Sequence, residues 1–142
     1  AAVFALKCLT EGDARPAAVV IKHNTPCGAA RGVSVIESWK RALAGDPVSA
    51  FGGIVAFSHE VDGETAMAMA EVFLEVIVAP AFTPEARAAF AKKGALRLLE
   101  VPNLASAPLP LRLPHHYLSP SLASSCAWSR RGLGLPGLRV VS

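Results

Sequence analysis

Two side chains able to do acid–base chemistry stand next to each other early in the chain, at Lys22 and His23. They follow the apolar run 17–21, which is typical of a strand covered on both faces. Parallel α/β sheets bind ligands at the carboxyl ends of their strands, so a cation and a titratable imidazole here favour a ligand site. Pro26 and Gly28 predict a turn just beyond them. Taken alone, the pair is more often a solvated lysine and a hydrogen-bonded histidine than a functional site.

Two further places along the chain could contact a ligand. Gly52 and Gly53 would let a ligand approach the backbone closely, and Phe51 before them offers a flat face to a heterocycle. Glu75 leads into the apolar run 76–79, where a carboxylate at the edge of a strand can bind hydroxyls or an amine. The alternatives are a helix-to-strand turn that buries Phe51 in the core, and an exposed Glu75 that binds nothing.

The elements that must position these residues alternate between helix and strand patterns through residues 1–100. The patterns predict strands over 17–21, 54–57, 76–79 and 96–101, and helices over 1–11, 34–44, 62–72 and 83–94. Ser34, Asp62 and Thr83 are expected to cap the last three helices. Helices between apolar strands predict an α/β fold, with a mostly parallel sheet and helices packed on its faces.

Residues 102–142 differ in composition from the rest of the chain. They hold six of the 11 prolines and four arginines, but none of the 11 acidic residues. Because proline removes a backbone donor and breaks helices, we expect an irregular tail here and a single domain over 1–101. The tail also accounts for the net charge of +3. Its arginines are scattered without interleaved aromatics, which does not favour binding to nucleic acid.

Other features of the composition exclude several classes of protein. The three cysteines show no CxxC spacing, so neither a disulfide framework nor a structural zinc site is expected. The apolar runs are shorter than the roughly 20 residues that a membrane-spanning helix needs. No basic-then-apolar secretory signal opens the chain. We therefore expect a soluble, cytoplasmic protein without a metal or a membrane partner.

The segments that hold the candidate residues are Lys-His-Asn-Thr-Pro-Cys-Gly at 22–28, Ser-Ala-Phe-Gly-Gly-Ile-Val-Ala-Phe at 49–57 and Phe-Leu-Glu-Val-Ile-Val-Ala-Pro at 73–80. In order and spacing they resemble the formyltransferase domain of the bifunctional purine-biosynthesis enzyme family, over about residues 14–101. The resemblance implies a cytidine-deaminase-like, three-layer α/β unit that works as a homodimer. It also implies transfer of a formyl group from 10-formyltetrahydrofolate to 5-aminoimidazole-4-carboxamide ribonucleotide.

The resemblance further implies roles for individual residues. Lys22 and His23 match the family's catalytic pair. His23 would remove a proton from the weakly nucleophilic aromatic amine, and Lys22 would stabilise the oxyanion that forms on the formyl carbon. Four residues would bind the nucleotide substrate: Asn24, Phe51, Gly52 and Glu75. Cys27 would serve packing, and no metal is implied.

The chain also departs from the family. The family's transferase region is longer, and its later half supplies further catalytic and folate-binding residues, so we expect this partial domain to be inactive alone. The cyclohydrolase domain of the family is absent from this sequence. Residues 102–137 do not match the family, and a shifted reading frame in a GC-rich gene would explain their composition.

Two alternatives from other functional classes remain. A zinc deaminase would need a His- or Cys-x-Glu segment and a Pro-Cys-x-x-Cys pair. Here Thr25 stands where the glutamate is needed, and no second cysteine follows Cys27 at that spacing. The other alternative is a non-catalytic remnant that binds a nucleotide or associates with itself, as the apolar composition allows. The pair His115-His116 is interpreted as solvated rather than as a metal site.

Overall fold

The computed structural model of the chain describes residues 1–104 and 139–141. Its strands are β1 (Ala17–Lys22), β2 (Thr25–Arg31), β3 (Gly53–Phe57), β4 (Leu74–Ala79), β5 (Arg97–Glu100) and β6 (Arg139–Val141). Its helices are α1 (Ala2–Thr10), α2 (Val35–Leu43), α3 (Gly63–Met69) and α4 (Pro84–Phe90). The predicted strands and helices are therefore all present, and β2 was not predicted.

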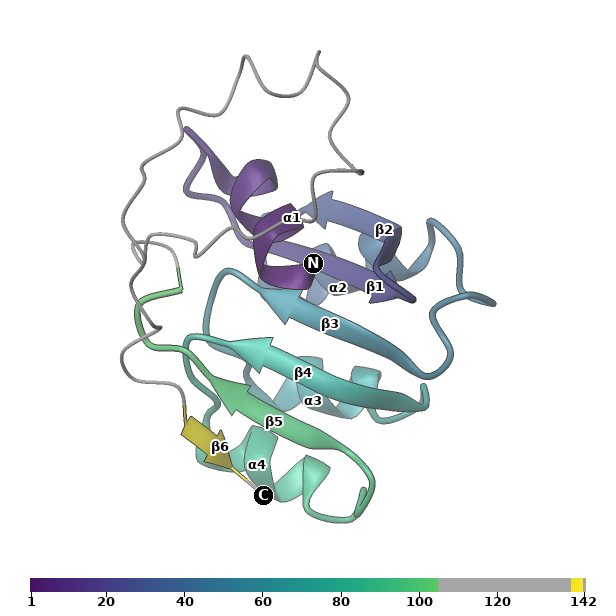
Figure 1. The fold of residues 1–142 in the computed structure, drawn as a ribbon. Coiled ribbons are helices and arrows are strands. Elements are labelled where there is room, and N and C mark those ends of the chain that lie inside the picture. Colours follow the sequence, from purple (N-terminus) through teal and green to yellow (C-terminus); the bar gives the residue numbers. More distant parts are fainter. Residues whose placement is uncertain (105–138, 142) are drawn as a thin grey trace.

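The six strands form one sheet in the order β2-β1-β3-β4-β5-β6 (Figure 1). Strands β3, β4 and β5 pair in parallel. Strand β1 runs antiparallel to both of its neighbours, β2 and β3, and β6 runs antiparallel to β5. Consequently four of the six strands point the same way: β2, β3, β4 and β5. The predicted α/β class with a mostly parallel sheet is confirmed, although the sheet also contains antiparallel pairs.

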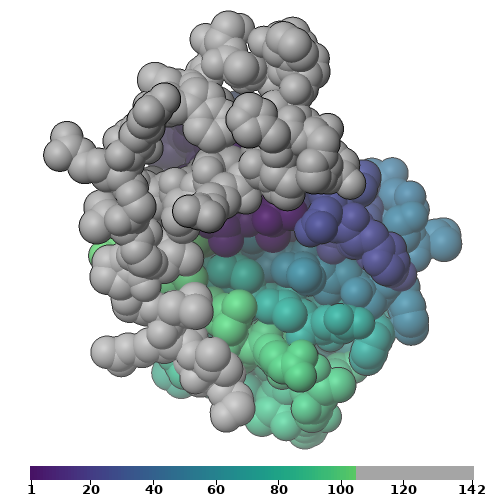
Figure 2. Space-filling model, viewed as in Figure 1, coloured from purple at the N-terminus to yellow at the C-terminus, as the bar shows by residue number. Residues whose placement is uncertain are grey.

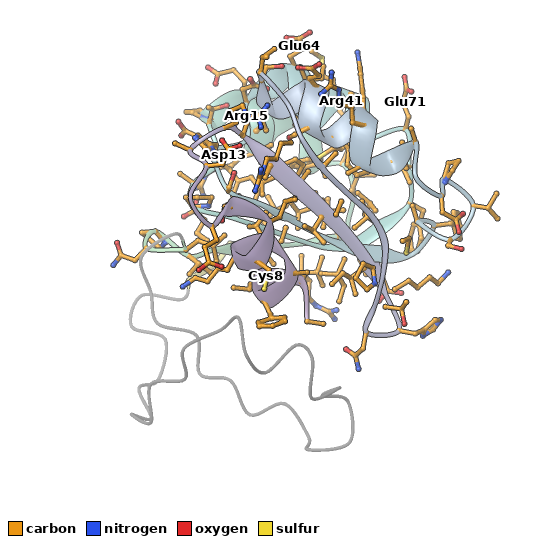
Figure 3. The ribbon with its side chains drawn as sticks, turned by 90° about the horizontal axis from the view of Figure 1, so that it is seen from above. Cys8, Asp13, Arg15, Arg41, Glu64 and Glu71 are labelled. Atoms are coloured by element: carbon orange, nitrogen blue, oxygen red, sulfur yellow. The ribbon has the colours of Figure 1, made fainter. Side chains whose placement is uncertain are left out.

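Helices cover the two faces of the sheet and give the molecule three layers (Figure 1, Figure 3). On one face, α2, α3 and α4 enclose a core that includes Trp39, Phe57 and Ile77. On the other face, α1 buries Leu6 against β1 and β3. All residues of β1 except Lys22 are buried, because this strand has helices on both sides. The doubly covered strand predicted at 17–21 is thus confirmed.

The structure differs from the prediction just after β1. The turn is made by His23 and Asn24, whose φ angles of 50° and 66° are those of a two-residue hairpin. Pro26 and Gly28, which were predicted to form the turn, lie within β2. Proline is tolerated there because β2 is an edge strand. Gly28 is required there because α2 passes so close that a Cβ would lie 1.8 Å from the carbonyl oxygen of Ala42.

The predicted helix caps are confirmed. The side chains of Ser34, Asp62 and Thr83 each accept a hydrogen bond from the backbone N–H three residues further on, at 3.3, 2.8 and 3.2 Å. These bonds satisfy donors that the first helical turn leaves unpaired. Helices α3 and α4 end at Met69 and Phe90, earlier than the sequence pattern indicated.

The structure describes little of the region predicted to be an irregular tail. Strand β6 adds three residues to the edge of the sheet beside β5. Residues 105–138 and 142 lie outside the described part of the chain. The tail's irregularity, the frame-shift interpretation, the boundary between 101 and 102, and the reading of His115-His116 therefore stay predictions.

The loop between α1 and β1 is held by one carboxylate and two guanidinium groups. Asp13 accepts hydrogen bonds from the side chain and the backbone N–H of Arg15, and Arg31 lies 3.0 Å from the same carboxylate. The hydrogen bonds from the side chain of Arg15, followed by the one from its backbone, lower the pKa of Asp13 from 3.8 to about 2. A carboxyl whose pKa is depressed by folding stabilises the folded state above the unfolded pKa, and this contribution is lost as the pH falls through the folded pKa.

We therefore expect Asp13→Asn to lower the free energy of unfolding at pH 6, because the amide cannot carry the charge that the guanidiniums bind. The difference from the unaltered chain should shrink between pH 4 and pH 2, where the native carboxyl becomes protonated. Urea denaturation at a series of pH values measures this difference in the free energy of unfolding. A difference that is the same at pH 6 and pH 2 would show that the charge of Asp13 does not stabilise this loop.

Candidate functional site

The candidate residues meet where the carboxyl end of β1 lies beside the amino ends of β3 and β4. Because β1 runs antiparallel to β3, Ile21 pairs with Ile54, while Gly53 pairs with Leu74 on the next strand. This arrangement brings together Lys22, the loop before β3 and the first residues of β4. In Figure 1 and Figure 2 it forms the right-hand edge of the molecule, where the β1–β2 turn and the loop before β3 lie near each other.

Lys22 and His23 were expected at the carboxyl end of their strand, and they lie there. Because β1 runs antiparallel to β3, this end lies at the amino-terminal edge of the parallel strands β3 and β4. The expectation drawn from ligand sites at the carboxyl ends of parallel strands therefore does not apply to this edge.

Lys22 is tied to the loop before β3. Its Nζ donates a hydrogen bond to the backbone carbonyl of Phe51 at 2.5 Å. An ammonium group has three donors, so two remain for a ligand after this bond is made. The bond joins residues that are far apart in sequence and fixes the cation beside Phe51 instead of leaving it free in solvent. The interpretation of Lys22 as merely a solvated lysine is not supported by this contact.

The aromatic ring of Phe51 does not lie in the core. Its side chain is 59% exposed and contacts the ring of Phe73, which is 45% exposed. The ring centroids are 5.1 Å apart, with an angle of 35° between the planes. The alternative that Phe51 is a core residue is therefore wrong. Two tilted, partly exposed rings offer a large apolar surface beside a cation, which is unusual on a surface that binds nothing.

Gly52 brings the backbone close to the acidic residue of the site. Its φ of +69° lies in the left-handed region that glycine adopts without strain, and its N–H donates to the carbonyl of Phe73 at 2.8 Å. A Cβ at Gly52 would lie 3.7 Å from Oε1 of Glu75, so the carboxylate stands beside this bare stretch of backbone. Gly53 serves packing instead, because it is buried and a Cβ there would lie 3.2 Å from the carbonyl oxygen of Ile21.

His23 and Asn24 lie at the tip of the β1–β2 turn, and both side chains are exposed. Within residues 1–104, neither side chain makes a hydrogen bond to the other members of the site. A positive φ is uncommon outside glycine, although asparagine and histidine adopt it more often than most residues. The structure therefore groups Lys22, Phe51, Gly52 and Glu75, and holds His23 and Asn24 next to this group on an exposed turn.

Phe73 is the residue that the sequence argument missed. It stands within the family-like segment 73–80, directly before β4, but nothing in its immediate sequence separates an exposed ring from a core ring. Phe73 also lines an apolar cavity of about 210 Å³ between β4 and the ends of α3 and α4. Its position two residues before Glu75, a candidate ligand contact, is the feature of the sequence that could have indicated Phe73.

Comparison with known proteins agrees with the motifs at this edge. The family model described as AICARFT/IMPCHase bienzyme matches residues 2–115, so the expectation that the family likeness ends before residue 102 is wrong for 102–115. The chain belongs to the AICARFT/IMPCHase bienzyme family. The bifunctional purine biosynthesis protein PurH of Myxococcus xanthus is 55% identical over 103 residues, which cover 72% of this chain and 20% of that protein. The same protein of a Cyanothece species is 53% identical over 96 residues, 68% of this chain and 19% of that protein.

The chain thus spans about a fifth of the length of these AICARFT/IMPCHase relatives. Solved structures of RibD from Acinetobacter baumannii share its fold. Form 1 aligns with a TM-score of 0.60 and 12% identity over 74% of this chain and 36% of that one. Form 2 gives a TM-score of 0.56 and 11% identity over 68% and 33% of the two chains. The predicted cytidine-deaminase-like, three-layer α/β unit is confirmed.

The remaining predictions for this family member concern Cys27, a metal site and a membrane-spanning helix. Cys27 is partly buried in β2 and packs against the core, in keeping with a packing role. Among residues 1–104 and 139–141, no three His, Cys, Asp or Glu side chains are grouped as a metal site would need. In the same residues, no helix combines the length and the apolar character that crossing a bilayer requires.

Proposed function

We propose that this chain forms part of a formyltransferase site in purine biosynthesis. The reaction would transfer the formyl group of 10-formyltetrahydrofolate to the 5-amino group of 5-aminoimidazole-4-carboxamide ribonucleotide. Membership of the AICARFT/IMPCHase family supports the proposal. The observation that carries it is the hydrogen bond that holds the ammonium of Lys22 on the Phe51 carbonyl, beside two exposed rings and a carboxylate.

Each contact at this edge suits one part of the nucleotide. The planar imidazole carboxamide would stack on the rings of Phe51 and Phe73, which are both partly exposed. Gly52 has no side chain to keep the heterocycle away from the backbone. The carboxylate of Glu75, which stands beside Gly52, would accept hydrogen bonds from hydroxyl or amine groups of the substrate. Asn24 would add a donor and an acceptor from the neighbouring turn.

The catalytic step follows from the charges of Lys22 and His23. The amine nitrogen attacks the formyl carbon, and the carbonyl oxygen takes up negative charge that the Lys22 ammonium stabilises. His23 accepts the proton that the nitrogen loses, acting as a general base. The bond from the formyl carbon to the folate nitrogen then breaks, that nitrogen takes up the proton from His23, and tetrahydrofolate leaves. The exposed turn leaves the His23 side chain unhindered by contacts with the other described residues of the site.

We further propose that this site is completed by parts of the protein outside the chain. The relatives are about five times longer than the matched region. The roles proposed above for this chain include no residue that binds the folate. A homodimer would cover the exposed rings of Phe51 and Phe73. The ribonucleotide and the folate would be its substrates. The protein would act in the cytoplasm. The isolated chain should then bind the nucleotide weakly and show negligible formyl transfer.

Calorimetric titration with the carboxamide ribonucleotide tests the proposal. We expect the double variant Lys22→Ala, His23→Ala to bind at least about tenfold more weakly than the unaltered chain, since it loses one charge-assisted hydrogen bond and one imidazole contact. Lys40→Ala is the matched control, because Lys40 is exposed on α2 and takes no part in the site. Equal heats for the double variant and the control would remove the site assignment, while circular dichroism verifies that all three chains fold.

A second candidate function rests on the exposed apolar side chains. Val33, Val48 and Met67 are 84%, 83% and 63% exposed, in addition to the two rings of the site. Surface of this kind favours a chain that binds a nucleotide, or associates with itself, without catalysing a reaction. Light scattering, which distinguishes a monomer from an assembly, tests this second function.

A further inference from the structure

A second group of charged side chains surrounds a cavity at the other edge of the sheet. The cavity has a volume of about 540 Å³ and is lined by α1, the loop before β1, the loop after β3 and Leu104. In Figure 1 these segments lie on the left, opposite the edge that carries Lys22. Strand β1 joins the two edges, and its length keeps them about 17 Å apart. The volume lies within the range of small-molecule sites, about 300–1,000 Å³.

In the loop before β1, the charged residues that line this cavity are Asp13 and Arg15, and Arg31 of β2 lies beside them. Glu11 of the same loop does not line the cavity. Asp13 supplies the negative charge, and its carboxylate already pairs with both Arg15, at 2.7 Å, and Arg31, at 3.0 Å. Figure 3 shows Asp13 and Arg15 next to each other on this loop. The side chain of Arg15 binds Asp13 through Nε and Nη2, which leaves Nη1 as a further donor. Two guanidiniums on one carboxylate leave a net positive charge beside the cavity.

Lys7 adds a cation from the last turn of α1. It lines the cavity, and among the residues that the structure describes no carboxylate pairs with it. Partial burial lowers the pKa of Lys7, so its ammonium is less well hydrated than that of a fully exposed lysine. A cation in such surroundings gains more from an anion than a surface lysine does, since water screens the pair less.

His59 adds a donor from the loop after β3. Its Nδ1 lies 2.9 Å from the hydroxyl oxygen of Ser58, and that oxygen accepts a hydrogen bond from the N–H of Ala17 at 2.8 Å. The same hydroxyl also lies 3.4 Å from the carbonyl oxygen of Ala17, a longer contact. We assign its one proton to the shorter contact, so that Ser58 donates to Nδ1 and the ring carries its own proton on Nε2. The ring is thereby oriented, and its Nε2–H is available at the exposed side of the cavity.

We propose that this cavity binds the phosphate group of a small anionic ligand through Lys7, Arg15 and His59. The three side chains come from three separate segments and line one cavity with an excess of positive charge. A phosphate group has several oxygens that can accept from all three at once. Leu6 and Leu104, which are almost fully buried, lie beneath these polar groups as the floor of the cavity. None of these residues belongs to the Lys22 edge, so the site is independent of the proposed formyl transfer.

Titration with inorganic phosphate tests the proposal, at an ionic strength that sodium chloride holds constant. Binding is followed by NMR through the backbone amide signals of the isotope-labelled chain. We expect saturating shifts at Lys7, at residues 12–15 and at residues 58–59. Lys7→Gln should weaken binding at least about tenfold, because it removes a charge-assisted hydrogen bond. Lys40→Gln, on the opposite face of the sheet, should leave the affinity unchanged.

Either of two results would overturn the proposal. One is a set of shifts that grow without saturation and spread over the exposed basic residues of the chain. The other is the same affinity in Lys7→Gln as in Lys40→Gln. If Lys7→Gln fails to fold, His59→Gln takes its place, because His59 is exposed and its replacement removes only the Nε2–H donor and the contact with Ser58. Unchanged affinity in His59→Gln would then count against the site.

Discussion

Gly28→Ala is expected to destabilise the fold by at least about 3 kcal/mol, the upper range for adding a methyl group to a packed interior. The added Cβ would lie 1.8 Å from the carbonyl oxygen of Ala42 and 2.9 Å from its carbonyl carbon. Both atoms belong to the backbone of α2, so no side-chain rotation can relieve the clash. Strand β2 and α2 would have to separate, and with them the packing on this face of the sheet. Urea denaturation followed by circular dichroism measures the loss.

Gly94→Ala is the matched control for this substitution. Gly94 follows α4, its φ is not in the left-handed region, and a Cβ there would meet no atom within 4 Å. We expect its free energy of unfolding to stay within about 0.5 kcal/mol of the unaltered chain. If Gly28→Ala were equally harmless, residue 28 would not face α2, and the turn predicted from Pro26 and Gly28 would have to be reconsidered.

Trp39→Ala should lower the free energy of unfolding by about 3–5 kcal/mol, the usual range for removing a large aromatic side chain from a core. Trp39 is only 1% exposed and packs from α2 onto the sheet. Its ring centroid lies 6.5 Å from that of Phe57 on β3, at an angle of 52°. The substitution leaves a cavity between α2 and β3, the strand that begins at the candidate site. Chemical denaturation gives the size of the loss.

Met67→Ala provides the comparison for Trp39, since Met67 lies on a neighbouring helix of the same layer but is 63% exposed. We expect a change within about 0.5 kcal/mol. A similar small change for Trp39→Ala would mean that α2 does not pack on the sheet through this residue.

The elements that could be predicted from the sequence are those with local causes. The capped helices begin where Ser34, Asp62 and Thr83 stand, because a cap depends on residues only three positions apart. The strand at 17–21 was predictable because burial on both faces selects a continuous apolar run. Strand β2 was missed because Pro26 and Gly28 usually interrupt regular structure. Their acceptance in a strand depends on an edge position and on a helix packed from far along the chain.

The candidate site was predicted in its residues but not in its geometry. Lys22, Phe51 and Glu75 belong to three segments whose proximity depends on the pairing of β1 with β3 and of β3 with β4. The direction of β1 is a property of the whole sheet and leaves no mark in its own apolar run, so the position of its carboxyl end at the amino-terminal edge of β3 and β4 could not be predicted. Phe73 was missed for a related reason. Its exposure results from where the sheet ends, which local sequence does not encode.

The pairing of β1 with β3, and of β3 with β4, has a consequence for the order in which the protein is made. A ribosome releases Lys22 long before Glu75, and no shorter nascent chain contains all the walls of the candidate site. Contacts between residues so distant in sequence form slowly, because the intervening loop must lose its freedom first. Until β4 has emerged, the first hairpin and Phe51 should expose apolar surface to other nascent chains and to chaperones.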